Sequence, residues 1–316
     1  MTITKVLFLL LLIFFTACSQ DEKTKIIDVD SSEVISDLDI AQDKTKKSKK
    51  SIYYFGFDLR GEPQEDVAQY LPLLKYLHQE TGFNFKLSIT PQDSSTDEEL
   101  CLGNTQFSIL GALSFIKAHT KCDAKVLVKG LNHQGLPTYT SMFITKKGSK
   151  INSLSDLKGV KFAFGSKNST QGYLIPRQIL NENHLSLKDF SEFIITDSHQ
   201  ECAEAVLSGG YDVCSLQDTL AKKLQKDGLV KIIYTSHHYP SSLISVSKDV
   251  PLKVVQKIKK ALLAFDPLEK NKKELYHWEN TEMPHGFTEG KLLDYSLLHK
   301  LATNLGIVKE CDKDVK

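Results

Sequence analysis

The feature that most constrains the fold is an alternation of short apolar strands with amphipathic helices, which begins at residue 52 and continues to about residue 265. One helix is predicted over 65–81, because apolar side chains recur there at helical spacing and Gly82 follows. Another is predicted over 252–265. Strands are predicted over 52–57, 83–89, 107–110, 125–128, 138–145, 193–196, 211–216, 231–235 and 243–246. This order predicts an α/β protein with mainly parallel strands, and no internal repeat is found.

One further strand, at residues 160–164, runs into a short polar turn, after which Ser169 and Thr170 stand where a helix would begin. The first backbone N–H groups of a helix have no intrahelical partner, and the helix dipole makes that end positive. Two hydroxyl groups add donors, and Gly172 would let a ligand approach the backbone. The segment therefore predicts an anion-binding site, although the same residues also fit a plain serine N-cap on a surface helix.

The N-terminus predicts export. Lys5 precedes an apolar run over 6–15 that is too short to span a bilayer but has the length of a signal peptide. The run ends in Phe15-Thr16-Ala17-Cys18, which resembles the lipobox of bacterial lipoproteins, with Phe15 in place of the usual leucine. The resemblance implies that residues 1–17 are removed and that Cys18 is lipidated. An ordinary signal peptide with cleavage at another bond is the alternative.

Residues 18–51 are expected to be the lipidated cysteine and a disordered tether, because 19–51 holds no aromatic residue and clusters its charges. The lysine-rich end, 44–50, fits either a soluble spacer or a contact with anionic lipid headgroups. Nucleic-acid binding is not expected, since the formal net charge is +1 and no other basic cluster of note occurs.

Five groups of short motifs follow one another from residue 52 to residue 267. They are FGF at 55–57 with YLPLLKYL at 70–77, LSDLKG at 154–159 with NSTQGYLIPR at 168–177, Ser198-His199, GGYDV at 209–213, and IYTS at 233–236 with Pro240 and KDVP at 248–251. In this order they resemble the phosphate, phosphite and phosphonate (PhnD-like) periplasmic binding proteins of ABC importers.

The resemblance implies a type II periplasmic binding protein, with two α/β lobes, a ligand cleft and two hinge crossings. Lobe 1 would comprise residues 52–135 and 242–316, and lobe 2 residues 136–241. The crossings are expected near 136–141 and 235–243. Closure of the lobes would bury the anion and exclude water, which strengthens charge-assisted contacts.

The resemblance also implies the ligand-binding residues. Ser169 and Thr170 would donate hydroxyl and backbone hydrogen bonds to the oxyanion, and Gln171 replaces a third hydroxyl with a longer donor. Gly172 and Tyr173 complete the segment. His199 would donate from the start of its own helix, although taken alone it also fits a partly exposed residue at a helix start.

Departures from the family pattern bear on the ligand. Phe115 stands where the family commonly supplies a cleft tyrosine, so the aromatic wall is kept and the hydroxyl is lost. Aminophosphonate binders use acidic groups after the histidine helix and in the second crossing, where this chain has Asp218 and the pair Ser241-Ser242. A pocket with few carboxylates is expected, and with it a compact or apolar-tailed oxyanion.

The cysteines leave the disulfide pairing open. Besides Cys18 there are five, and pairing inside each lobe, Cys101 with Cys122 and Cys202 with Cys214, is compatible with their order. No Cys-x-x-Cys occurs, and the adjacent pair His237-His238 lacks metal-ligand spacing. No metal and no cofactor are expected.

These features predict a membrane-anchored, periplasm-facing lipoprotein of the bacterial envelope that binds a phosphate- or phosphonate-type oxyanion for an ABC permease. The alternative is a lipoprotein of the same fold that senses the ligand and reports to a signalling partner. A neighbouring permease gene would distinguish the two. An exported enzyme is disfavoured, because no nucleophile elbow, no His-Glu-x-x-His and no phosphate loop occurs.

Overall fold

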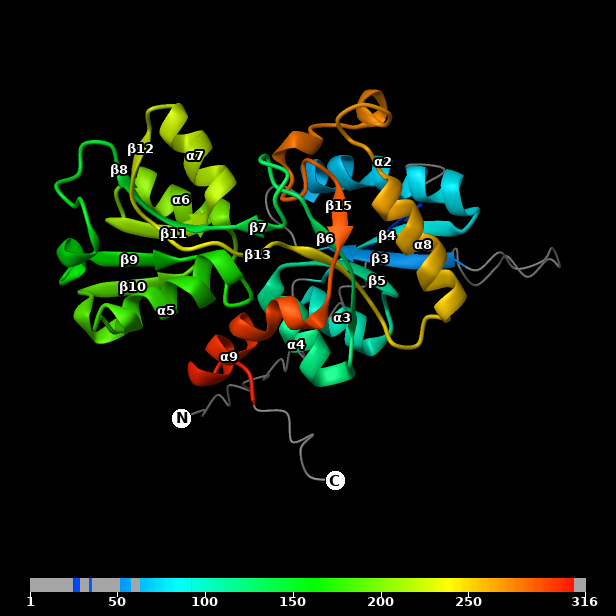
Figure 1. The fold of residues 1–316 in the computed structure, drawn as a ribbon. Helices are drawn as coiled ribbons and strands as arrows, with labels where there is room; N and C mark the ends of the chain where they lie inside the picture. Colours follow the sequence, from blue (N-terminus) through cyan, green and yellow to red (C-terminus); the bar gives the residue numbers. More distant parts are fainter. Residues whose placement is uncertain (1–24, 29–33, 36–51, 58–62, 92, 310–316) are drawn as a thin grey trace, which may run out of the picture.

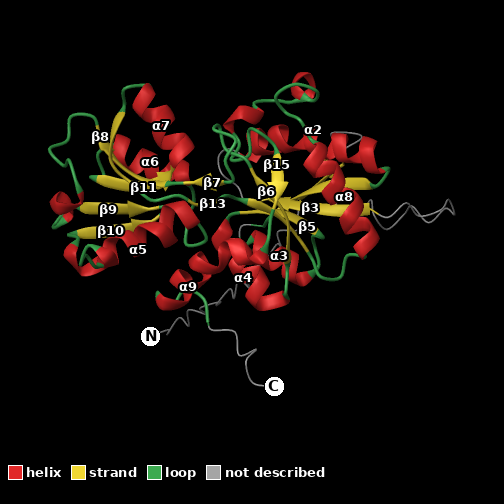
Figure 2. Ribbon diagram, viewed as in Figure 1, coloured by secondary structure: helices red, strands yellow, loops and turns green. Residues whose placement is uncertain are grey.

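The computed structural model describes residues 25–28, 34–35, 52–57, 63–91 and 93–309. Figure 1 shows two α/β lobes lying side by side, with the short strands β7 and β13 between them. In Figure 2, helices cover both faces of the sheet in each lobe. None of the helices in these described ranges is long and apolar enough to cross a membrane.

Lobe 1 is built on a sheet with the strand order β15-β6-β14-β5-β3-β4-β1-β2. Its strands are β1 (Lys25–Asp28), β2 (Val34–Ile35), β3 (Ile52–Phe57), β4 (Asn84–Ile89), β5 (Phe107–Leu110), β6 (Lys125–Gly130), β14 (Leu243–Val246) and β15 (Phe287–Glu289). Strand β3 is parallel to both β4 and β5. Strand β14, the first in this sheet after the second crossing, is antiparallel to both β5 and β6.

All but the last of the lobe 1 helices pack on this sheet, and the last one packs on the helix over residues 112–122. The helices are α2 (Pro63–Thr81), α3 (Thr96–Leu102), α4 (Ala112–Cys122), α8 (Leu252–Ala264) and α9 (Ser296–Asn304), with short turns η4 (Lys272–Glu274), η5 (Trp278–Asn280) and η6 (Leu292–Tyr295). Helix α2 ends as predicted: Gly82 has a φ of 68° and donates its N–H to His78 O at 2.7 Å. Tyr70, Leu74 and Leu77 of α2 are buried in the lobe 1 core.

Lobe 2 is built on a sheet with the order β10-β9-β11-β8-β12. Its elements are β8 (Ser141–Lys146), β9 (Lys161–Phe164), β10 (Glu192–Ile195), β11 (Val213–Gln217), β12 (Val230–Thr235), α5 (Ile175–Glu182), α6 (His199–Leu207), α7 (Asp218–Lys226), and the turns η1 (Leu154–Leu157), η2 (Thr170–Leu174) and η3 (Leu187–Asp189). Strands β10, β9 and β11 are parallel. Phe143, Phe162, Phe164 and Phe190 form an aromatic core beneath them.

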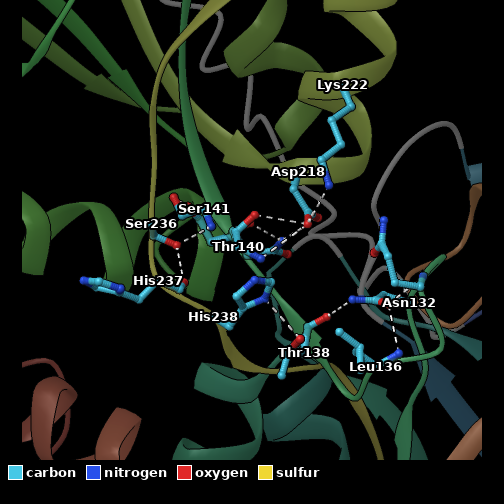
Figure 3. A network of polar contacts seen from close by, with 12 residues as sticks. Asn132, Leu136, Thr138, Thr140, Ser141, Asp218, Lys222, Ser236, His237 and His238 are labelled. Carbon is cyan, nitrogen blue, oxygen red and sulfur yellow. Dashed lines mark hydrogen bonds and ion pairs between the residues drawn. The ribbon is translucent and has the colours of Figure 1, made fainter.

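The two connections between the lobes pair with each other. Strand β7 (Thr138–Tyr139) and strand β13 (Tyr239–Pro240) are antiparallel, with Tyr239 opposite Tyr139. The single strand predicted over 138–145 is therefore broken at Thr140, because β7 pairs with the other crossing while β8 pairs with β11 and β12. In the close view of Figure 3, Thr138 accepts a hydrogen bond from Asn132, and Thr140 contacts Asp218.

The expectation of a disordered tether over 18–51 is wrong for two short segments. Strand β1 pairs with β4, Ile26 opposite Ser88 and Ile27 opposite Leu87, and β2 pairs with β1. The edge of a sheet leaves backbone N–H and C=O groups to be paired, and isoleucine favours strands. The prediction of disorder was based on the composition of the whole segment, and this did not reveal the short apolar run at Ile26 and Ile27. The rest of the segment, with Cys18, lies outside the described residues.

Two disulfides lie within single lobes. Cys101–Cys122 joins α3 to α4, and Cys202–Cys214 joins α6 to β11. Both pairings were compatible with the sequence order. With two α/β lobes and two crossings, the chain has the type II periplasmic-binding-protein fold that was expected.

Candidate functional site

A cavity of about 1120 Å³ lies between the lobes and is lined almost entirely by polar residues from both. Lobe 2 contributes Ser166, Lys167, Asn168, Ser169, Thr170, Gln171, Ile195, Thr196, Asp197, Ser198, His199, Gln200, Glu201 and Glu204, and the remaining lining is Thr90, Pro91, Ser94, Ser95, Thr96, Gly111, Tyr139, Ser242 and Glu282. Serine, threonine and amide groups dominate, so the cavity suits a small ligand with many hydrogen-bonding atoms.

Ser169 begins a helix, as predicted, and its first turn is a π-turn. The Ser169 Oγ accepts the N–H of Gly172 at 2.8 Å and caps η2, which continues into α5. The same oxygen lies 3.2 Å from His199 Nε2. With Nε2 protonated, His199 donates to Ser169, and the hydroxyl proton of Ser169 can be given to an acceptor in the cavity.

Thr170 joins the two lobes. Its Oγ1 accepts the backbone N–H of Leu113, in the first turn of α4, at 2.8 Å. A second hydrogen bond also joins α4 to lobe 2: Lys117 Nζ donates to Asn168 Oδ1 at 2.5 Å. Since Thr170 Oγ1 acts as acceptor toward Leu113, its own proton can be donated to a third group.

His199 is the first residue of α6 and is 8% exposed. The N-cap Ser198 accepts the N–H of Glu201 at 3.1 Å. The contact with Ser169 fixes the His199 ring, and the Cys202–Cys214 disulfide fixes α6, the helix that carries it, to β11. The histidine thus presents its ring in the cavity wall beside the start of η2.

Gln171 lines the cavity but directs its amide toward the crossing. Its Nε2 donates to Thr140 O at 2.9 Å and to Asp218 Oδ1 at 3.3 Å. Its backbone oxygen accepts the Ser141 hydroxyl at 2.5 Å. The Gln171 side chain therefore connects lobe 2 to the first crossing. Its amide nitrogen, which was expected to donate to the ligand, donates to Thr140 and Asp218 instead.

Gly172 does not line the cavity. A Cβ at this position would lie 2.9 Å from Gly165 Cα and 3.1 Å from His199 Cε1. Its oxygen accepts the N–H of Gly165 and the hydroxyl of Ser215, both at 2.9 Å. The close approach that requires glycine is therefore between β9, η2 and His199, and not between the backbone and a ligand.

Tyr173, Phe115 and Asp218 are also absent from the lining of this cavity. The Tyr173 ring packs against Phe164, and its hydroxyl accepts a hydrogen bond from Arg177 at 2.8 Å. Phe115 is fully buried and packs edge-to-face on Tyr295, so it belongs to the core. Because α4 turns this side chain inward, the expected aromatic wall is wrong for Phe115.

Asp218 lies at the start of α7 and binds the first crossing. It accepts the Thr140 hydroxyl at 3.2 Å and forms an ion pair with Lys222 at 3.6 Å (Figure 3). It lines a second, smaller cavity of about 430 Å³, together with His133 and Glu282.

The expectation of few carboxylates is wrong. Four line the large cavity, namely Asp197, Glu201, Glu204 and Glu282, of which the first three are exposed and Glu282 is buried. Glu282 accepts a hydrogen bond from Ser242. Its position could not be read from the sequence, because 40 residues separate it from Ser242 and no motif connects them. No group of three or more potential metal ligands occurs among the residues that the structure describes.

Residues 55–295 match the family model described as ABC transporter, phosphonate, periplasmic substrate-binding protein. The chain belongs to this family. The resemblance predicted from the sequence is thereby confirmed, and the family is one of substrate-binding proteins rather than enzymes.

Over 209 residues the chain is 25% identical to the phosphonates-binding periplasmic protein of Escherichia coli (strain K12), which is 62% of this chain and 61% of that protein. Over 162 residues it is 28% identical to the probable ABC transporter phosphite binding protein PhnD1 of Prochlorococcus marinus (strain MIT 9301), 48% of each chain. The matches thus span about half to two thirds of the length of these curated relatives.

The fold is also that of PhnD1 from Prochlorococcus marinus (MIT 9301), solved in complex with methylphosphonate. The TM-score is 0.73 at 18% identity, covering 81% of this chain and 99% of that chain.

Proposed function

We propose that this protein is a substrate-binding lipoprotein that captures a phosphate- or phosphonate-type oxyanion between its lobes and delivers it to an ABC importer. The observation that supports this most directly is the convergence of Ser169, Thr170 and His199 on one interlobe cavity. Ser169 and Thr170 offer hydroxyl protons to an acceptor, and His199 donates to Ser169 and so leaves the Ser169 proton for the cavity. Membership of the phosphonate-binding family gives the class of that acceptor.

The two helix starts supply the electrostatics. Ser169 caps η2 and Ser198 caps α6, so the positive ends of two helices face the same space. The exposed Lys167 lines that space as well. An oxyanion held there would receive hydroxyl and backbone donors, and hydrogen bonds to a charged group are each worth about 1.5–3 kcal/mol.

The closed arrangement supports capture. Thr170 accepts from Leu113, and Asn168 accepts from Lys117, so both contacts join lobe 1 to the residues that would hold the anion. A ligand that contacts both walls favours this arrangement over an open one, and the permease would recognise the closed form.

Isothermal titration calorimetry of the detergent-purified full-length protein with methylphosphonate, phosphite and phosphate tests the proposal. Ligand at a hundredfold excess over Kd raises stability by about 2.7 kcal/mol, which a thermal melt detects. Ser169→Ala should weaken binding, whereas Ser155→Ala, an exposed serine in η1 outside the cavity, should not. Absence of binding by all three ligands would refute the proposed function.

We further propose that Cys18 anchors the protein to the membrane with its lobes facing the periplasm, because the lipobox-like residues 15–18 end a signal-peptide-length apolar run. Cys18→Ser should release the protein from the membrane fraction or leave it unprocessed. A processed variant that remains in the membrane pellet would contradict this anchoring.

Loss of uptake of the ligand in a strain lacking the protein would distinguish a transporter component from a sensor.

A further inference from the structure

Asn168 directly precedes Ser169 in the chain and lines the same interlobe cavity. Consecutive Cα atoms are about 3.8 Å apart, so the two side chains start next to each other. The Ser169 N–H donates to Ser166 O at 2.8 Å, and this turn holds both residues at the entry to η2. Asn168 is therefore placed beside the hydroxyl groups that would hold the anion.

The Asn168 amide is bonded at its oxygen end to the other lobe. Its Oδ1 accepts a hydrogen bond from Lys117 Nζ of α4 at 2.5 Å. An ammonium group can only donate, so the amide atom that faces α4 must be the oxygen and not the nitrogen. Since the amide is planar, its Nδ2 then points away from Lys117.

The Nδ2 of Asn168 is a donor that the protein does not use. Among the residues that the structure describes, none accepts either of its two protons, and this nitrogen is not one of the enclosed polar atoms. Asn168 is half-buried in the cavity wall, whereas Lys117 is not part of the lining. The free end of the amide is thus the end that is offered to the cavity.

Helix α4 contacts both chain neighbours of Ser169. Leu113 and Lys117 are four residues apart, so they lie on one face of α4 in successive turns. The Leu113 N–H donates to Thr170, and Lys117 donates to Asn168. Because α4 belongs to lobe 1 and Asn168 to lobe 2, the hydrogen bond that orients the amide depends on the lobes being together.

We propose that Asn168 is a further ligand-binding residue, whose Nδ2 donates to the oxyanion, and that Lys117 is the positioning residue that turns this donor toward the cavity. Linked hydrogen bonds polarise one another, so the ammonium group also makes the Nδ2 protons better donors to an anion. A donor of this kind suits a phosphoryl group in either of its ionisation states near neutral pH. This inference rests on the proposed function.

Calorimetry of the full-length protein with methylphosphonate, phosphite and phosphate at about pH 7, where an aspartate is ionised, tests the role of Asn168. Asn168→Ala should raise Kd roughly ten- to 150-fold, the worth of a hydrogen bond to a charged group. Asn168→Asp should raise it further, because a carboxylate then faces the anion, although the same carboxylate can form an ion pair with Lys117. A residue that only joined the lobes would keep its affinity in Asn168→Asp.

Asn152→Asp is the matched control for this change of charge. Asn152 also belongs to lobe 2, and its Oδ1 also accepts a hydrogen bond from a lysine, Lys231 Nζ, at 2.6 Å. It lies outside the lining of the cavity. Asn152→Asp should therefore keep the wild-type Kd.

The role of Lys117 is tested by a double-mutant cycle. Lys117→Met keeps an unbranched side chain and loses the ammonium group, so it should weaken binding, but by less than Asn168→Ala. In the Asn168→Ala background it should have little further effect, because the amide that it positions is gone. Lys121→Met, one turn further along α4 and outside the cavity lining, is the control for the lost charge and should keep the wild-type Kd.

Wild-type affinity in any one of Asn168→Ala, Asn168→Asp and Lys117→Met, each shown to be folded by a thermal melt, would overturn the inference while leaving the proposed function intact. Equal weakening by Lys117→Met with and without the Asn168 side chain would overturn it too, because the lysine would then act without the amide. Failure of the wild type to bind any of the three ligands would refute the proposed function itself.

Discussion

Replacing Thr170 by valine should weaken anion binding and favour the open arrangement of the lobes at the same time. Valine keeps the branched shape and loses the hydroxyl. Thr170 is 3% exposed, and its Oγ1 accepts the Leu113 N–H at 2.8 Å. Loss of a hydrogen bond to a charged ligand costs about 1.5–3 kcal/mol, which raises Kd roughly ten- to 150-fold.

The contact between Thr170 and Leu113 adds a second effect. When the hydroxyl is removed, the backbone N–H of Leu113 loses this acceptor in the closed form, and a buried donor without a partner costs about 1–3 kcal/mol. In the open form water can satisfy that N–H, so the cost falls on closure alone. The two terms share one hydroxyl and are not additive, and a rise in Kd of at least about tenfold is expected.

Calorimetry with methylphosphonate gives Kd, and the radius of gyration from small-angle X-ray scattering with and without ligand reports closure. Thr170→Ser, which keeps the hydroxyl, should retain most of the affinity. Thr145→Val is the matched control, because Thr145 is equally buried in lobe 2 and donates to Asp212 O, away from the cavity. Wild-type affinity and wild-type closure in Thr170→Val would refute the reasoning.

Three further predictions concern the same elements. His199→Ala should weaken anion binding, and His199→Asn, which keeps a short donor, should recover part of the loss; equal affinity of His199→Ala and wild type in calorimetry would remove the histidine from the site. Replacing both Cys202 and Cys214 by serine should lower the free energy of unfolding by about 3 kcal/mol in a denaturant titration and weaken anion binding, since α6 is then no longer tied to β11. Burial alone would raise the pKa of Asp294, but the hydrogen bond from Lys129 Nζ and that from the Lys291 backbone lower the pKa overall. As pH falls, Asp294 is therefore protonated in the unfolded chain before it is protonated in the folded one. The stabilisation is present above about pH 4 and is lost as pH falls through the lowered pKa of the folded protein. Asp294→Asn should flatten the acid side of a plot of Tm against pH, and an unchanged slope would contradict this.

Much of the fold could be predicted because it depends on local periodicity. The spacing of apolar residues before Gly82 predicted α2. Ser169 is confirmed as the N-cap of η2, and His199 is confirmed as the first residue of a helix, α6. Side chains that cap a helix bond to backbone only two or three residues away, so their role is written in consecutive residues. The order of the motifs then predicted the family.

Other features depend on partners that are distant in the chain. Gly172 is required by Gly165 and His199, and Phe115 turns toward Tyr295 in the C-terminal part of lobe 1. Strand β1 finds its partner in β4, some sixty residues later. None of these contacts leaves a periodic trace in the sequence, because each results from two surfaces that meet only when the chain has folded.

The sequence alone therefore determined the succession of strands and helices, the family, and the hydroxyl groups and histidine at two helix starts. Only the tertiary structure decided which polar side chains share the cavity. It placed Asp218 and the Gln171 amide at the crossing, and it brought Glu282 to Ser242. The physical reason is that helix caps are local interactions, whereas the composition of a cleft between two lobes is set by how segments far apart in the chain pack against each other.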